Sequence, residues 1–148
     1  MNYARWSNNL LTGNREIDQQ HKAIFDQAEK LFGWAQVGKA GEQLEEIFKF
    51  LENYIENHFQ LEEKLQRQLD YPYYEQHRGE HNEYRRRYQT IKGQYNQNGP
   101  SLQLTMQTIT FTLEWLTEHI HKCDKELASF IKYKSQSDAT VKTKIPQL

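Results

Sequence analysis

The chain has 148 residues, 36% hydrophobic and 26% charged, which suits one domain with a single buried core. A formal net charge of −1 gives no electrostatic basis for nucleic-acid binding, and the densest basic run, residues 85–87, is interpreted as a solvated helix face. No stretch approaches the about 18 apolar residues of a membrane span, and the N-terminus lacks the apolar segment of a signal peptide. The single cysteine, Cys123, excludes an intrachain disulfide.

The first half of the chain predicts two helices after an irregular start. Residues 1–17 show no sustained hydrophobic period, so we expect an irregular N-terminal arm. Asp18 is expected to cap a helix over residues 19–35, where apolar side chains recur every three or four positions. The glycine-rich residues 38–41 end that pattern, and a second helix is predicted from about Glu42 to Leu69.

The second half predicts two more helices and a tail. Helical periodicity runs from about Tyr73 to Tyr95, and again from Ser101 to Phe130 or Ile131. Residues 134–148 lose the period and are expected to be disordered. Four long helices with short connections favour an all-α fold, an up-down-up-down four-helix bundle formed by residues 1–133.

Seven metal-binding side chains occur in four clusters, on the predicted inner faces of these helices. Helical residues four apart share a face, so each i,i+4 pair would point the same way. Five imidazoles and two carboxylates are too many ligands for one metal ion and suit two ions bridged by the carboxylates. Imidazole with carboxylate favours iron, manganese or zinc, and redox use of two metals favours iron. The predicted ligands are His21, His58, Glu62, His77, His81, His119 and Asp124.

The last cluster leaves an alternative open. Cys123 stands four residues after His119 and Asp124 stands five after it, so a regular α-helix would direct the thiol to the site. A hard carboxylate bridges two irons better, and Asp124 could reach the site through a π-bulge in the helix or through an oblique approach of the helix. We predict Asp124 as the ligand and keep Cys123 as the alternative. His121 is expected on the surface, and Glu63 is expected to turn away from the ligand face.

Two other kinds of metal site compete with this interpretation. A ferritin-like di-iron site needs Glu-x-x-His on two helices. This chain has one such pair, Glu118 and His121, on the wrong face. A structural zinc bundle is the other competitor, and metal analysis would distinguish it.

The sequence resembles the hemerythrin family in its short bacterial single-domain form. The resemblance covers about residues 6–131 and includes all seven predicted ligands in order. The resemblance also favours Asp124, five residues after His119, as the ligand of the last cluster. The matching runs are IDQQH at 17–21, HFQLEE at 58–63, HRGEH at 77–81 and WLTEHIHKCD at 115–124.

The resemblance implies two non-haem iron ions with different surroundings. One iron would be held by His77, His81 and His119, and the other by His21 and His58. The second iron would keep one position open for O2. Both would be bridged by an oxo or hydroxo group together with two carboxylates, Glu62 and Asp124.

Four apolar residues near the ligands are expected to form a dry wall over the open position and to slow autoxidation. They are Ile24, Phe59, Trp115 and Leu116.

The predicted function is therefore reversible O2 binding for oxygen storage, transport or delivery, and we do not predict an enzyme. One alternative is a module that senses O2 or redox state. Another is a di-iron enzyme acting on nitric oxide or peroxide. We expect a cytoplasmic protein, and the polar outer faces of the helices favour a monomer.

Overall fold

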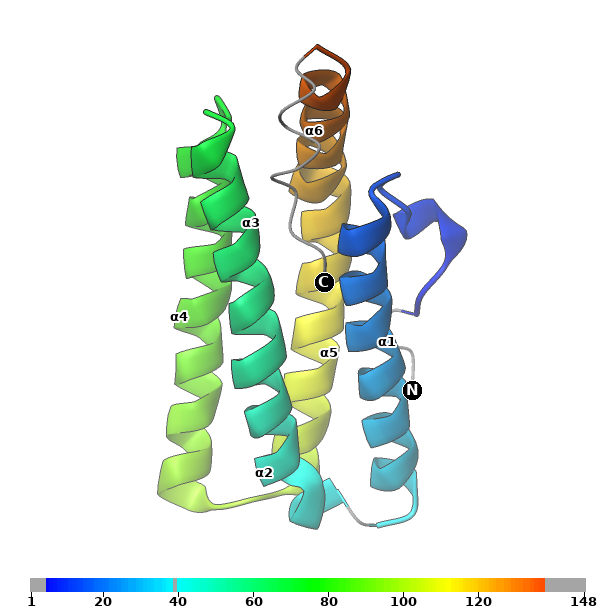
Figure 1. The fold of residues 1–148 in the computed structure, drawn as a ribbon. Coiled ribbons are helices and arrows are strands. Elements are labelled where there is room, and N and C mark those ends of the chain that lie inside the picture. Colours follow the sequence, from blue (N-terminus) through cyan, green and yellow to red (C-terminus); the bar gives the residue numbers. More distant parts are fainter. Residues whose placement is uncertain (1–4, 39, 138–148) are drawn as a thin grey trace.

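The computed structural model describes residues 5–38 and 40–137, which form helices joined by short turns (Figure 1). Of the segments labelled η, the first is a 3₁₀-helix and the other two are π-helical. The order is η1 (Asn8–Leu10), α1 (Arg15–Gln36), α2 (Ala40–Phe50), η2 (Leu51–Ile55), α3 (Glu56–Gln68), α4 (Tyr74–Asn98), α5 (Leu102–His119), η3 (Ile120–Asp124) and α6 (Lys125–Ser137).

These segments make four long rods, because α2, η2 and α3 are continuous, as are α5, η3 and α6. Successive rods run in opposite directions (Figure 1). α1 contacts α2 and α5, while α4 contacts α3 and α5, so the bundle closes between the first rod and the last. The prediction of an all-α, up-down-up-down four-helix bundle is confirmed. Over the described residues, every helix is too short or too polar to cross a membrane.

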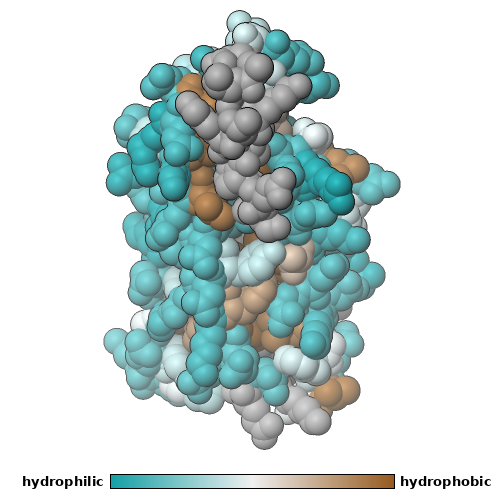
Figure 2. Space-filling view, viewed as in Figure 1, coloured by the Kyte–Doolittle hydropathy of each residue, from teal (hydrophilic) through white to brown (hydrophobic). Residues whose placement is uncertain are grey.

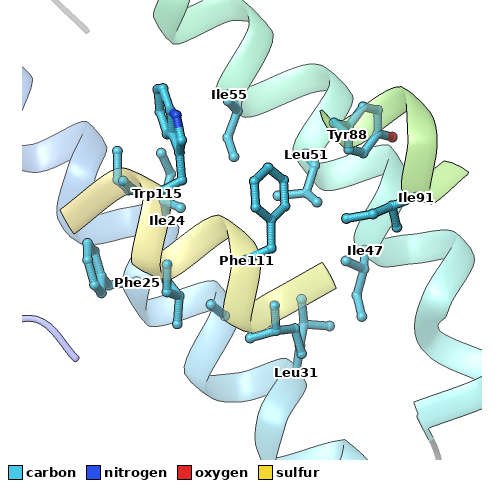
Figure 3. Packing of buried hydrophobic residues seen from close by; sticks show 14 of the residues in the cluster. Ile24, Phe25, Leu31, Ile47, Leu51, Ile55, Tyr88, Ile91, Phe111 and Trp115 are labelled. Atoms are coloured by element: carbon cyan, nitrogen blue, oxygen red, sulfur yellow. The ribbon is translucent and has the colours of Figure 1, made fainter. Parts of the chain in front are cut away.

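The apolar core is divided into two parts. The larger cluster fills the half of the bundle around α2, α5 and the C-terminal half of α1, and Figure 3 shows its aliphatic and aromatic side chains packed together. A smaller cluster joins α1, α3 and α6 near the other end, and it includes Ile17, Leu65 and Leu127. In the view of Figure 2 the outer surface is mostly hydrophilic, with apolar side chains showing in a narrower central band.

The first helix begins earlier than predicted. Asn14, not Asp18, is the N-cap of α1, and its side chain accepts a hydrogen bond from the backbone N–H of Ile17 at 3.1 Å. Asp18 lies in the first turn, where its carboxylate accepts from the N–H and the hydroxyl of Thr12, both at 2.8 Å. It also accepts from the N–H of Gly13 at 3.3 Å. The side chain of Asp18 therefore holds the N-terminal arm against α1.

α4 continues past its predicted end at Tyr95. It passes through Gly93 and ends at Asn98, because a single glycine costs a helix only about 1 kcal/mol and does not stop it. Gly99 follows with φ +76°, the left-handed conformation that favours glycine. The helix therefore stops at Gly99, three residues beyond Asn96.

The last helix runs into the predicted disordered tail, residues 134–148. α6 ends at Ser137, and the hydroxyl of Ser135 donates to the carbonyl of Ile131 at 2.9 Å. Ile131 is only 2% exposed, so its packing anchors the last turns and the helix propagates beyond it. The remainder of the predicted tail, residues 138–148, lies outside the described residues.

The contacts of Asp18 predict a measurable stabilisation by this side chain. Asp18→Ala should lower the free energy of unfolding by about 1–2 kcal/mol, because three hydrogen bonds to the arm are lost. Asp26→Ala, an exposed position on the same helix, should change it by less than about 0.5 kcal/mol. Urea unfolding at pH 7 measures both variants, and equal effects would contradict this role for Asp18.

Candidate metal site

All seven predicted ligand side chains are buried, and they meet in one polar layer between the two apolar clusters. Each rod of the bundle contributes at least one of them. His21 comes from α1, His58 and Glu62 from α3, His77 and His81 from α4, His119 from the end of α5 and Asp124 from η3.

The seven residues form two groups that could each hold an ion, and within each group the ligand atoms lie within 4.8 Å of one another. One group is Glu62, His77, His81 and His119, and the other is His21, His58, Glu62 and Asp124. In the first, the Nε2 atom of His119 lies 3.1 Å from that of His77 and 3.2 Å from that of His81. Neighbouring atoms bonded at ~2.1 Å around an octahedral ion are about 3 Å apart, so this spacing fits one ion.

Glu62 lies between the two groups, with one oxygen directed at each. Its Oε1 atom is 3.0 Å from Nε2 of His58, and its Oε2 atom is 3.0 Å from Nε2 of His77. A carboxylate in this position can bridge two ions.

Asp124 makes a similar arrangement, with one oxygen near each histidine group. Its Oδ2 atom is 2.8 Å from Nε2 of His21, while Oδ1 is 3.1 Å from Nε2 of both His77 and His119. The two carboxylates therefore connect the same two histidine groups.

A π-helical turn brings Asp124 into the layer. η3 spans Ile120–Asp124, so the residue five positions after His119 returns to the same face. The π-bulge predicted from the sequence is thus present. Cys123 belongs to neither of the two groups around the carboxylates but forms a third possible group with Glu80 and His119. Burial, with the nearby charges of Asp124 and Glu80, raises the pKa of its thiol to about 12.

The donor atoms fit metal ions better than they fit one another. Several are buried and lack a hydrogen bond within the described part of the chain, namely Nε2 of His21 and His58, Oε1 of Glu62 and both oxygens of Asp124. They approach opposite charges closely but not at hydrogen-bonding angles. An unsatisfied buried polar group costs about 1–3 kcal/mol, and an ion placed among these atoms would satisfy several at once.

The charges within the cluster control where protons lie when no metal is bound. Burial lowers the pKa of His77, but the carboxylates of Asp124 and Glu62 beside its Nε2 atom outweigh burial and raise the pKa to about 10. Burial and the charge of Asp124 raise the pKa of Glu62, but His58 and His77 bring it well below its ordinary value. Metal-free protein at neutral pH therefore holds ionised carboxylates against protonated imidazole.

Two residues that support the site were not predicted from the sequence. Glu63 turns away from the ligand face, as expected, but it accepts a hydrogen bond from Nδ1 of His81 at 2.9 Å. Arg85 donates to the same Glu63 oxygen at 2.9 Å and binds both oxygens of Glu56. The interpretation of residues 85–87 as a solvated face is therefore wrong for Arg85. Its position four residues after His81, on the ligand-bearing face of α4, was the signal available in the sequence.

A third supporting residue was also missed. Gln20, which precedes His21 on α1, accepts a short hydrogen bond from Nδ1 of His58 through Oε1. The neighbour of one candidate ligand thus positions another candidate ligand on a different helix.

The four predicted wall residues are all buried, but two of them lie against the three-histidine group. Phe59 stacks on the ring of His81 at 3.9 Å, and Trp115 stacks on His119 at 4.5 Å. Ile24 and Leu116 are 1% and 2% exposed in the same core cluster. The stacking contacts of Phe59 and Trp115 therefore fall on the three-histidine group, and a wall over the open position of the other ion stays a prediction.

Comparison with known proteins agrees with this geometry. The family model described as the hemerythrin HHE cation binding domain matches residues 12–131. A bacteriohemerythrin of Methylococcus capsulatus is 29% identical over 118 residues, which are 73% of this chain and 80% of the relative. A bacteriohemerythrin of Pseudomonas aeruginosa is 27% identical over 128 residues, 86% of this chain and 81% of the relative. No solved structure gives a significant match.

The raised pKa of His77 predicts a pH dependence of the metal-free protein. A pKa raised from 6.5 to about 10 adds stability below pH 6.5, and this stability is lost as the pH rises towards 10. Urea unfolding of the metal-free chain across this range should show the loss. Adding Fe(II) at pH 7 without oxygen should release protons, because the imidazole must be neutral to bind.

Two variants make this test specific. His77→Gln should remove most of the pH dependence and reduce proton release, whereas His121→Gln, at an exposed position, should leave both unchanged. Calorimetric titration in two buffers with different ionisation heats measures the protons, and iron binding without proton release would contradict the assignment.

Proposed function

Since the chain belongs to the hemerythrin family, we propose that it binds O2 reversibly at a non-haem di-iron centre, for oxygen storage, transport or delivery. The observation that carries this proposal is the placement of the two carboxylates. Glu62 and Asp124 each present one oxygen to a three-histidine group and the other to a two-histidine group. Two bridged ions with unequal numbers of histidines are what this arrangement suits.

The unequal histidine groups would make one ion closed and the other open. His77, His81 and His119 would hold the first ion and His21 and His58 the second, with the two carboxylates and an oxo or hydroxo group shared. Three histidines, two carboxylate oxygens and the shared oxygen make six ligands, whereas two histidines leave the other ion with five. When bound, the di-iron centre supplies the electrons and the vacant position that O2 needs.

The rest of the site supports binding rather than catalysis. Reversible O2 binding requires no general acid, nucleophile or substrate pocket, and the side chains described around the carboxylates include candidate ligands, hydrogen-bond partners such as Glu63 and Gln20, and buried apolar groups. Ile24, Phe59, Trp115 and Leu116 would exclude water and so slow autoxidation. A cytoplasmic monomer remains our prediction.

A metal count combined with a visible spectrum tests this function. The purified protein is reduced without oxygen, exposed to air and then returned to an oxygen-free atmosphere. We expect two irons per chain and a visible absorption band that appears with O2 and vanishes when O2 is removed. Asp124→Asn should lower the iron content, whereas His121→Gln should not.

Each other outcome favours a different alternative. Two irons with immediate irreversible oxidation would favour a sensor of O2 or redox state. Turnover of nitric oxide or peroxide by the iron-loaded protein would favour a di-iron enzyme. Zinc, or no metal at all, would contradict the proposal.

The dry wall predicts that Leu116 protects the iron from autoxidation. Leu116→Ala should lose about 2–5 kcal/mol of stability and should also speed autoxidation in air, followed by the decay of the visible band. Leu104→Ala makes the same truncation at a buried position in the first turn of α5, so its autoxidation rate should stay near that of the wild type. Equal rates in the two variants would show that packing alone, not exclusion of water at the iron, explains the effect.

A further inference from the structure

A chain of charged contacts leads from the surface to one candidate ligand. The Nδ1–H group of His81 donates to Oε1 of Glu63 at 2.9 Å, and Nη1 of Arg85 donates to the same oxygen at 2.9 Å. Arg85 is held in place by Glu56 at 2.8 Å and by Asn82 at 2.9 Å. The side chain of Glu63 is 10% exposed and that of Arg85 25%, so the contacts pass from half-buried to buried surroundings.

The same contact fixes which nitrogen of His81 carries a proton. A carboxylate can only accept, so Nδ1 must donate and Nε2 keeps its lone pair. That Nε2 atom is the one that faces the site, 3.2 Å from Nε2 of His119 and 3.4 Å from Oε2 of Glu62. Phe59 stacks on the His81 ring at 3.9 Å and Arg85 lies 5.2 Å from the centre of the Phe59 ring, so the imidazole is also held across its face.

The other histidine group has a neutral counterpart. His58 donates from Nδ1 to the amide oxygen of Gln20. The Nδ1 atoms of His21, His77 and His119 have no hydrogen bond within residues 5–38 and 40–137. Thus each group has one histidine with a side-chain acceptor, an ionised carboxylate in one group and an amide in the other.

We propose that Glu63, set by Arg85, is a positioning residue that makes the ion bound by His77, His81 and His119 easier to oxidise than the ion bound by His21 and His58. This inference rests on the proposed di-iron function. A carboxylate acceptor draws the imidazole proton towards itself, which increases electron density on the ligating nitrogen and stabilises the higher oxidation state of the metal. Arg85 limits this effect, because it shares the same carboxylate oxygen.

The two side chains should therefore shift the reduction potential in opposite directions. Glu63→Gln replaces the carboxylate with an amide of the same size. The ferric-to-ferrous ratio at a fixed electrode potential should therefore fall about tenfold, which corresponds to a rise of about 59 mV in the one-electron reduction potential. Arg85→Gln leaves Glu63 on His81 as a stronger acceptor, so the potential should fall. Spectroelectrochemistry of the iron-loaded protein measures both. Loss of Fe(II) to a chelator should be about tenfold faster in Glu63→Gln.

Glu56→Gln is the matched control, because Glu56 binds Arg85 but does not touch His81. It should shift the potential by much less than Glu63→Gln. A similar shift would show that net charge, not the hydrogen bond, is responsible and would overturn the inference. Shifts of the same sign in the Glu63 and Arg85 variants would also overturn it, since general loosening of the site moves both alike.

The two proposals fail in different ways. If the wild-type protein takes up no iron, the proposed function fails and this inference fails with it. If wild type and variants all hold two irons per chain with equal potentials, the inference alone is wrong.

Discussion

The burial of two carboxylates among five imidazoles is the constraint on which the rest of the structure depends. Glu62 and Asp124 are 3% and 0% exposed, and an ionised carboxylate in an apolar interior is costly unless it is paired or bound to metal. The bundle therefore cannot be a uniform apolar core. It separates a large apolar cluster from a smaller one by a polar layer, and each rod must present its polar side chains at the same height.

Helix geometry meets this constraint in two ways. α4 uses regular i,i+4 spacing, which places His77 and His81 on one face. The last rod instead contains the π-helical turn η3, which lets Asp124 approach the site while Ile120 and Leu127 stay in the core at 0% exposed. One extra residue in one turn changes which side chain faces the layer, yet the packing on both sides of the turn continues.

The fold and the convergence of the candidate ligands could be predicted because both follow from periodic patterns in the sequence. His21 and His58 stand where apolar residues are expected, so their place in the core could be inferred without coordinates. Glu63 and Arg85 could not be placed in the same way. Whether a polar residue beside the apolar stripe faces solvent or a neighbouring helix depends on the rotation of both helices. The same holds for Gln20, whose partner lies on another rod.

The supporting hydrogen bonds give the two histidine groups different chemistry as well as different numbers of histidines. His58 is held by an amide and His81 by a carboxylate that an arginine partly neutralises. In the proposed di-iron centre, unequal sites would help the pair of ions to give electrons to O2 and recover them, because the open ion would bind O2 while the closed ion would stabilise the oxidised charge. Under the two proposals, residues that do not touch the ions would supply part of this electronic asymmetry, and α4 could carry it since ligands and Arg85 share one helix face.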